Sequence, residues 1–197
     1  METRAALVVG ASSDIGAAIA HALATGGFDC LLWGRDRARL SAVGSRWDVV
    51  DLRSPDDVRA GIGRLPARLS AVVYAAGLFD RAPADTGDPD VWDELVTVNL
   101  AAAMRVTRGV LPALLAAAPS SLVLLGSLDV RDRDVAVTLL SPGLVAAGAG
   151  LGAPGVRPEE LLQPADVADA VRWVVGTPPH VCPVEVELQP QRSPGTG

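Results

Sequence analysis

The chain has 197 residues, of which 49% are hydrophobic and 20% are charged, and its formal net charge at pH 7 is −6. This length predicts one domain with a substantial core. The acidic balance and the lack of an arginine cluster argue against nucleic acid and anionic membranes as partners. All 17 basic residues are arginine, and Tyr74 is the only tyrosine. Chemistry that needs a lysine of this chain is therefore excluded.

The sequence shows no segment typical of export or of a membrane anchor. The richest apolar stretch, residues 110–126, is interrupted by Pro112, Pro119 and two serines, and it falls short of the roughly 18 residues that span a bilayer. The first residues run directly into a predicted strand and lack the layout of a signal peptide. Cys30 and Cys182 lie in distant apolar segments, which favours buried free thiols over a disulfide. These features predict a cytoplasmic location.

Short apolar runs alternate with helical patterns along the chain. Strands are predicted at residues 5–9, 30–33, 49–50, 71–74, 122–125, 135–140 and 184–188. Helices are predicted from Ile15 to Gly26, at residues 38–43, after the Ser54-Pro55 cap, at residues 91–118 with a bend at Pro112, and at residues 164–175. This alternation predicts an α/β doubly wound parallel sheet. We expect one dinucleotide-binding domain over residues 1–189 and a flexible tail over residues 190–197.

A glycine-rich turn, Gly10-Ala-Ser-Ser-Asp-Ile-Gly16, lies between the first strand and the first helix. In this position backbone N–H groups and the helix N-terminus approach a pyrophosphate closely. Such turns also occur as plain structural turns, so the turn alone does not establish a nucleotide site.

Five more short segments follow the turn in order: Asp51-Leu52, Ala75-Ala76-Gly77, Val98-Asn99-Leu100, Leu125-Gly126-Ser127 and Leu140-Ser141-Pro142-Gly143. Together with the turn they resemble the short-chain dehydrogenase/reductase family over residues 5–143, and the resemblance resumes in the last helix and strand. It implies a Rossmann-type fold with a shortened C-terminal half, a nicotinamide cofactor and oxidoreductase chemistry. The cofactor-binding residues that it implies are Gly10, Ser12, Ile15, Gly16, Asp51, Leu52, Ala76, Gly77, Ser141, Pro142 and Gly143.

Arg35 follows the second strand, where NADP users of this family place a cation for the 2′-phosphate. A guanidinium fork suits that dianion, whereas an NAD user would place a carboxylate at the preceding position, which is Gly34 here. The resemblance therefore implies NADP(H) in preference to NAD(H). The alternative is that Arg35 is an ordinary solvated charge.

Two residues depart from the family's cofactor pattern. Asp14 replaces the middle glycine of the turn, and its carboxylate suits a helix N-terminus but would repel a pyrophosphate. Tyr74 and Ala75 replace the asparagines that usually precede the Ala-Gly pair. We expect Tyr74 to cover the edge of the core, too far from the nicotinamide to donate a proton.

The family uses Asn, Ser, Tyr and Lys for catalysis, and only Asn99 and Ser127 match. The missing pair belongs to a helix between strands five and six, but only residues 128–134 separate Ser127 from Val135. A crossover that contains a helix needs about 10–12 residues or more. We expect strand six to remain parallel without that helix; the alternative is a turn at residues 131–134 with strand six folded back.

Other candidate groups have weaker support. Asp129, Asp132 and Asp134 could supply an acid if burial raised a pKa, but alternating Asp and Arg in a short loop indicate solvated charges. His21 and His180 have no Cys or acidic neighbour at ligand spacing, so no metal site is predicted. Losing the helix would uncover an apolar strip of the sheet. A homo-oligomer, or a heteromer with a full-length relative, is therefore predicted.

The leading hypothesis is an atypical NADP(H)-dependent, ketoreductase-like oxidoreductase that acts on a small carbonyl or alcohol, with substrate assistance. The absence of lysine suggests a GC-rich bacterium and would fit secondary metabolism. Two alternatives stay open. One is a non-catalytic, nucleotide-binding subunit of a full-length relative. The other is a cofactor-independent isomerase, dehydratase or cyclase on the same fold.

Overall fold

The computed structural model describes residues 4–78, 88–125, 135–148 and 157–190. Its centre is a seven-stranded sheet in the order β3-β2-β1-β4-β5-β6-β7, in which every pair of neighbouring strands is parallel. The strands are β1 (Arg4–Val9), β2 (Phe28–Gly34), β3 (Trp47–Val49), β4 (Ala71–Tyr74), β5 (Ser120–Leu124), β6 (Val135–Pro142) and β7 (Glu185–Leu188). The predicted doubly wound fold is confirmed. The predicted tail, from residue 191 onward, lies outside the described residues.

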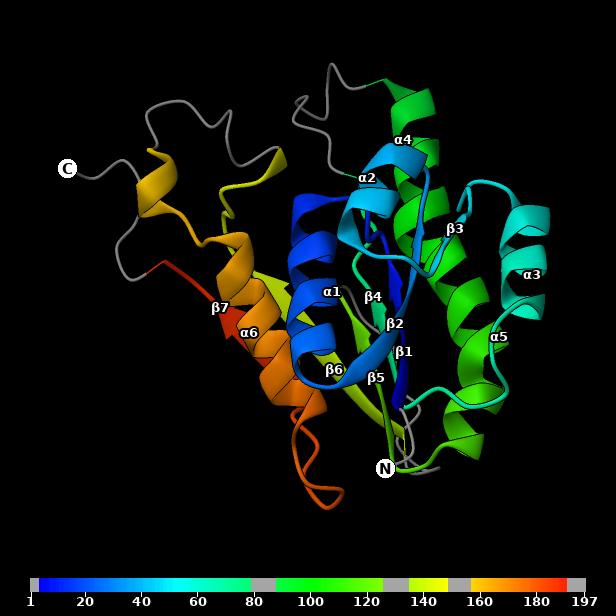
Figure 1. Ribbon diagram of the computed structural model, residues 1–197. Coiled ribbons are helices and arrows are strands. Elements are labelled where there is room, and N and C mark those ends of the chain that lie inside the picture. The colour runs from blue at the N-terminus through cyan, green and yellow to red at the C-terminus, as the bar shows by residue number, and fades with distance from the viewer. Residues whose placement is uncertain (1–3, 79–87, 126–134, 149–156, 191–197) are drawn as a thin grey trace.

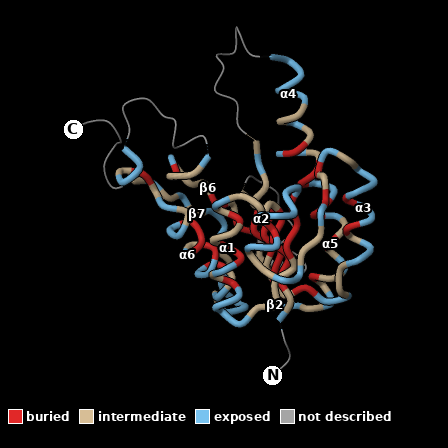
Figure 2. The backbone as a smooth tube through the Cα atoms, turned by 45° about the horizontal axis from the view of Figure 1, so that its top comes forward, coloured by how far each residue is buried: buried red, intermediate tan, exposed pale blue. Residues whose placement is uncertain are grey.

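Helices cover the sheet in two layers (Figure 1). On one face lie α1 (Asp14–Thr25), α2 (Arg37–Val43) and α6 (Pro164–Val175), and on the other α3 (Pro55–Gly63), α4 (Pro89–Val96) and α5 (Ala103–Ala116). Side chains of a strand alternate between the two cores. In β1, for example, Leu7 packs with the α3–α5 side and Val8 with the α1–α6 side. Figure 2 shows the buried residues concentrated between these layers.

Local sequence explains where these helices begin. Ser13, Asp36, Ser54 and Asp88 are the N-caps of α1, α2, α3 and α4, and each side chain accepts a hydrogen bond from a backbone N–H of the first turn. Proline stands in the first turn of α3, α4 and α6, where its missing N–H costs nothing. The predicted bounds of α6 and the predicted cap of α3 are confirmed.

Strand β6 runs parallel to β5, with Ser120 opposite Val135 and Leu124 opposite Leu139. The prediction of a parallel β6 is therefore confirmed, and the folded-back alternative is wrong. The parallel direction brings Ser141 and Pro142 to the carboxyl edge of the sheet, the edge at which β1 and β4 also end. The connection through residues 126–134, with its aspartates, lies outside the described residues.

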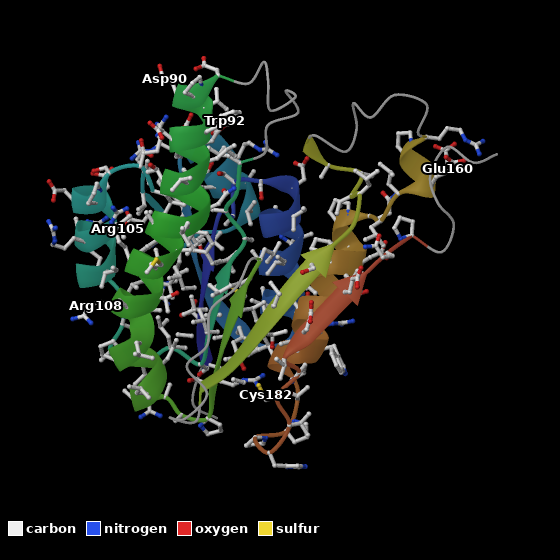
Figure 3. The ribbon with its side chains drawn as sticks, turned by 180° about the vertical axis from the view of Figure 1, so that it is seen from behind. Asp90, Trp92, Arg105, Arg108, Glu160 and Cys182 are labelled. Carbon is white, nitrogen blue, oxygen red and sulfur yellow. The ribbon has the colours of Figure 1, made fainter. Side chains whose placement is uncertain are left out.

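One face of the C-terminal strands has no helix against it among the residues that the structure describes (Figure 3). Val186 and Leu188 of β7 pack towards α6, so Glu185 and Glu187 project from the opposite face and are exposed. The apolar strip was predicted for the central strands. At the β7 edge the same face is acidic, because the strand alternation places Val186 and Leu188 under α6.

The long helix predicted over residues 91–118 is divided. Between α4 and α5 the chain forms a π-helical segment, η1 (Thr97–Ala102), while Pro112 lies inside α5. The irregular turn thus surrounds Asn99 rather than Pro112. By length and composition alone the stretch Pro89–Ala116 could cross a membrane. In the fold Val106, Val110 and Leu114 of this stretch are buried in the core.

Candidate nucleotide-binding site

A cavity of about 160 Å³ opens at the carboxyl edge of the sheet, beside the junction of β1 and β4. At this junction the strand order reverses, and ligands of open α/β sheets bind at such points. The volume is below the roughly 300–1,000 Å³ of a complete small-molecule site, so the cavity would enclose only part of a dinucleotide. Its lining includes Gly10, Ser12, Ser13, Gly34, Arg35, Asp51, Leu52, Arg53, Ala76, Gly77 and Val98.

The glycine-rich turn forms the floor of this cavity. Gly10 has a φ of +90°, and a Cβ there would lie 2.6 Å from the backbone nitrogen of Ala76. Only glycine therefore lets the turn approach the loop after β4 this closely. The Ser13 hydroxyl accepts a hydrogen bond from the N–H of Gly16 at 3.0 Å and donates one to the Gly10 carbonyl at 2.8 Å. These bonds fix the start of α1, whose first turn is the expected pyrophosphate position.

Gly34, Ser12 and Arg35 meet at the end of β2. A Cβ at Gly34 would lie 2.5 Å from the Ser12 hydroxyl oxygen and 2.9 Å from its Cβ. A carboxylate-bearing side chain at position 34 would therefore displace Ser12. Arg35 is exposed, lines the cavity, and forms no ion pair with any residue that the structure describes. Its guanidinium is available to a ligand at this edge.

Asp14, expected to repel a pyrophosphate, has a cationic partner. The Arg39 guanidinium, on α2, forms an ion pair with the Asp14 carboxylate at the start of α1. The pairing offsets the negative charge near the turn, so Asp14 is less of an obstacle to an anionic ligand than the sequence suggested.

Asp51, expected beside the adenine, is held by Arg53. The Arg53 Nε and Nη2 atoms donate to the two oxygens of the Asp51 carboxylate at 2.9 and 2.6 Å. These hydrogen bonds lower the pKa of Asp51, so the carboxylate is charged at neutral pH. Arg53 also donates to Glu94 of α4 at 3.3 Å. The cluster therefore joins the loop after β3, which lines the cavity, to α4.

Asn99 fixes the loop after β4. Its Oδ1 accepts from the backbone N–H of Leu78, and its Nδ2 donates to the Leu78 carbonyl, both at 2.8 Å. These two hydrogen bonds to the backbone hold the segment that contains Ala76 and Gly77 against the π-helical segment. In this arrangement Asn99 orients the wall of the cavity.

Tyr74 is a core residue, 2% exposed. Its hydroxyl donates to the Val98 carbonyl at 2.6 Å, and burial raises its pKa above the ordinary value. Val98 lies in η1, where the π-turn shifts the backbone hydrogen-bond register, so the Tyr74 hydroxyl provides a donor for a carbonyl of this irregular segment. Tyr74 thus has a structural partner, in agreement with the expectation that it is not a proton donor.

Of the remaining predicted site residues, some lie beside the cavity and others do not. Ile15 lies in the first turn of α1 and Gly16 follows it, beside the cavity's glycine turn. Ser141 and Pro142 end β6 and pair with Glu187 and Leu188 of β7, and the Gly143 N–H donates to the Leu188 carbonyl at 2.7 Å. None of these three is among the residues that line the cavity. Ser127 lies outside the described residues.

The cysteines are free thiols, as expected, but both are half-buried rather than buried. Burial and the neighbouring Asp29 carboxylate raise the pKa of Cys30 to about 11. A thiol with this pKa is almost entirely protonated at neutral pH, so Cys30 is a poor nucleophile.

Sequence reasoning missed Arg39 and Arg53. Arg39 lies 25 residues from Asp14, and Arg53 lies 41 residues from Glu94, so no local pattern connects either pair. Only the position of Arg53 two residues after Asp51 gave a sequence signal, because Asp and Arg at that spacing in a loop readily pair.

The structure is thus a Rossmann-type doubly wound domain with a cavity where the strand order reverses. The profile described as short chain dehydrogenase matches residues 4–139, and the chain belongs to this family. An uncharacterized oxidoreductase of Staphylococcus saprophyticus is 25% identical, with 96% of this chain and 98% of that protein covered.

Two solved structures show the same fold. The short chain dehydrogenase from Shigella flexneri has a TM-score of 0.86 at 25% identity and covers 98% of this chain and 93% of its own. A metagenomic short-chain oxidoreductase in complex with NADP has a TM-score of 0.75 at 26% identity and covers 96% of this chain and 98% of its own. Each is a relative of this chain by sequence and by fold.

The alignment with the staphylococcal relative extends over 231 positions, whereas this chain has 197 residues. The relative therefore contains segments that this chain lacks. The difference has the direction expected for a family member without the helix between β5 and β6.

Proposed function

We propose that this protein is an NADP(H)-dependent oxidoreductase that acts on a small carbonyl or alcohol. The observation that supports it most is the end of β2. There Ser12 occupies the space that a side chain at Gly34 would need, and Arg35 borders the cavity without an ion-pair partner among the described residues. This arrangement disfavours a ribose-binding carboxylate and favours a 2′-phosphate.

The residues present fit a dinucleotide phosphate. The first turn of α1, with Gly10 and Ser12, would take the pyrophosphate, because helix N-termini bind anions. Asp51 would accept from the adenine amino group, and Arg35 would take the 2′-phosphate. When bound, the nicotinamide supplies or removes a hydride. The relative solved with NADP is consistent with this choice of cofactor.

Proton transfer has to differ from that of relatives with a Tyr-Lys pair. The chain has no lysine, and the hydroxyl of its one tyrosine is bonded to Val98 in the core. We therefore expect the substrate to provide its own acidic hydroxyl, such as a phenol beside the carbonyl. The Ser127 hydroxyl would donate a hydrogen bond to the carbonyl oxygen, as its position in the family motif suggests.

A second candidate function has specific support. The buried Tyr74 leaves the described residues without a tyrosine acid, which also suits a nucleotide-binding subunit with no activity of its own. Such a subunit would bind NADPH tightly and would act only with a catalytic relative.

Turnover distinguishes the two candidates. We expect NADPH oxidation with an aryl ketone that has an adjacent phenol, and none with the ketone whose phenol is methylated. Ser127→Ala should lower kcat by about 10²–10³-fold, the usual effect of removing one oxyanion donor. Ser41→Ala, in the exposed face of α2, is the matched control and should leave kcat unchanged. Tight NADPH binding without turnover of either ketone would favour the non-catalytic subunit.

A further inference from the structure

Arg53 lies between two carboxylates at the wall of the cavity. Besides the bonds from its guanidinium to Asp51, its backbone N–H donates to the Asp51 Oδ1 at 3.0 Å. On the other side the guanidinium reaches Glu94 of α4 at 3.3 Å. Arg35, the other arginine that lines the cavity, forms no ion pair with a described residue. The two arginines therefore differ: Arg35 is available to a phosphate, whereas Arg53 is held in place by the protein.

The bonds from Arg53 fix the orientation of the Asp51 carboxylate. A backbone N–H that bonds to an aspartate side chain two residues earlier closes a local turn. In the same loop the Ser54 N–H donates to the Asp51 carbonyl at 3.0 Å. The Nε and Nη2 atoms of Arg53 add a planar fork across the two carboxylate oxygens. The carboxylate therefore cannot turn without breaking bonds to both the main chain and the side chain of Arg53.

Arg53 also uses most of the accepting capacity of Asp51. An ionised carboxylate has about four lone-pair sites and no donor. The backbone N–H, Nε and Nη2 of Arg53 take three of them, and Nε is shared between the two oxygens at 2.9 and 3.1 Å. One accepting site is left, on a residue that lines the cavity. Such a site takes a single N–H or O–H donor and repels another acceptor.

We propose that Arg53 is a positioning residue for base selection: it fixes Asp51 so that the cavity accepts a purine with an exocyclic amino group and rejects one with an oxo group at the same ring position. This role rests on the proposed function, in which Asp51 accepts a hydrogen bond from the adenine amino group. Hypoxanthine has a carbonyl oxygen in place of that amino group. With one oriented lone pair, Asp51 would bond adenine and repel hypoxanthine.

The charges around Asp51 keep it in the accepting form. They belong to Arg53 on its own loop, Arg35 after β2, Asp57 in the first turn of α3 and, through Arg53, Glu94 of α4. The hydrogen bonds from Arg53 are the main reason that the pKa of Asp51 lies below its ordinary value, although burial opposes them. A protonated Asp51 could donate to an oxo group. Base selection should therefore be present above this pKa and be lost only as the pH falls through it.

A tether for α4 is the alternative role of Arg53. No residue of α4 is buried, so the ion pair between Arg53 and Glu94 helps to hold this helix on the domain. The two roles depend on different partners, which can be removed one at a time. Glu94→Gln removes the charge of the tether and keeps the bonds from Arg53 to Asp51.

Binding of NADP⁺ and of nicotinamide hypoxanthine dinucleotide phosphate to the full chain tests the role of Arg53. The two ligands have the same phosphates, so the ratio of their dissociation constants isolates the base. We expect the unmodified protein to prefer adenine by about tenfold, the effect of one hydrogen bond to a partly exposed charged group. Arg53→Met should remove most of this preference, whereas Glu94→Gln, the matched control, should keep it. Calorimetric titration measures the constants, and circular dichroism checks that each variant is folded.

Further readouts separate positioning from a purely structural effect. Asp51→Asn replaces one oxygen by an N–H₂ donor, so it should bind both bases about equally, and adding Arg53→Met should then change the ratio no further. Arg53→Lys keeps one charged donor and should retain part of the preference that Arg53→Met loses. In the unmodified protein the preference should stay constant from about pH 8 to about pH 5, because Asp51 remains ionised over this range.

The possible failures are distinguishable. Equal affinity for the two bases, together with tight binding of NADP⁺, would overturn the role of Arg53 and leave the proposed function intact. Failure of both ligands to bind would overturn both. Equal losses of preference in Arg53→Met and Glu94→Gln would assign Arg53 to the tether alone. A further loss on adding Arg53→Met to Asp51→Asn would also contradict the proposal, because Arg53 would then not act through Asp51.

Discussion

At the scale of single residues, the cofactor choice depends on space as well as on charge. Ser12 fills the volume beside Gly34, and Arg35 adds a cation at the same edge of the cavity. A family member that prefers NAD would need a carboxylate in the place that Ser12 occupies. Gly34 and Ser12 therefore act together. Changing Gly34 alone should weaken cofactor binding rather than switch the preference from NADPH to NADH.

A switch of preference should consequently need two substitutions. Gly34→Asp alone should weaken both NADPH and NADH, because its Cβ would lie 2.5 Å from the Ser12 hydroxyl oxygen. Adding Ser12→Gly should restore NADH binding and leave NADPH weak, since the carboxylate would then bind the ribose and repel the phosphate. Calorimetric titration of both cofactors measures this. If Gly34→Asp alone bound NADH well, steric exclusion by Ser12 would be the wrong explanation.

Tyr74 provides a second test at this scale. Tyr74→Phe removes the buried hydrogen bond to Val98 and leaves that carbonyl without its donor. We expect the free energy of unfolding to fall by about 1–3 kcal/mol, with NADPH affinity and kcat unchanged. Urea denaturation and steady-state kinetics measure the two quantities. A large fall in kcat with unchanged stability would identify Tyr74 as a proton donor and contradict its structural role.

At the scale of elements, the π-helical segment determines the shape of the site. It places Asn99 where the oxygen and the nitrogen of its side-chain amide both form hydrogen bonds with the backbone of Leu78, next to Gly77. The helix that covers the core thereby also holds the loop after β4. Irregular turns of this kind often occur at functional sites. Here Asn99 of the π-helical segment is hydrogen-bonded to Leu78, which lines the cavity.

Replacing Asn99 should separate positioning from catalysis. Asn99→Ala removes both bonds, and Asn99→Asp removes the one that the side-chain amide donates to the Leu78 carbonyl. We expect the KM for NADPH to rise about tenfold in the alanine variant, and less in the aspartate variant, with little change in kcat. A fall in kcat at constant KM would instead indicate that Asn99 acts on the substrate.

At the scale of the whole molecule, periodicity and turn residues predicted most of the fold. The bounds of α6, the cap of α3 and the parallel direction of β6 follow from local signals and from the ordered motifs. The π-helical segment and the pairs Arg39–Asp14 and Arg53–Glu94 did not, because they depend on contacts between distant parts of the chain. The glycine turn and Asp51 were predicted as parts of one site, and both line the same cavity.

The central claim is that this site prefers a 2′-phosphate, and cofactor binding measures it directly. Trp33 lines the cavity and is 2% exposed, so its fluorescence should report adenosine binding. We expect NADPH to bind more tightly than NADH by about 1.5–3 kcal/mol, the range of a hydrogen bond to a charged group. Arg35→Ala should abolish the difference and leave NADH affinity unchanged, while Arg37→Ala, which changes an arginine stacked on Trp47, should preserve it. Equal affinities of the unmodified protein for NADPH and NADH would contradict the claim.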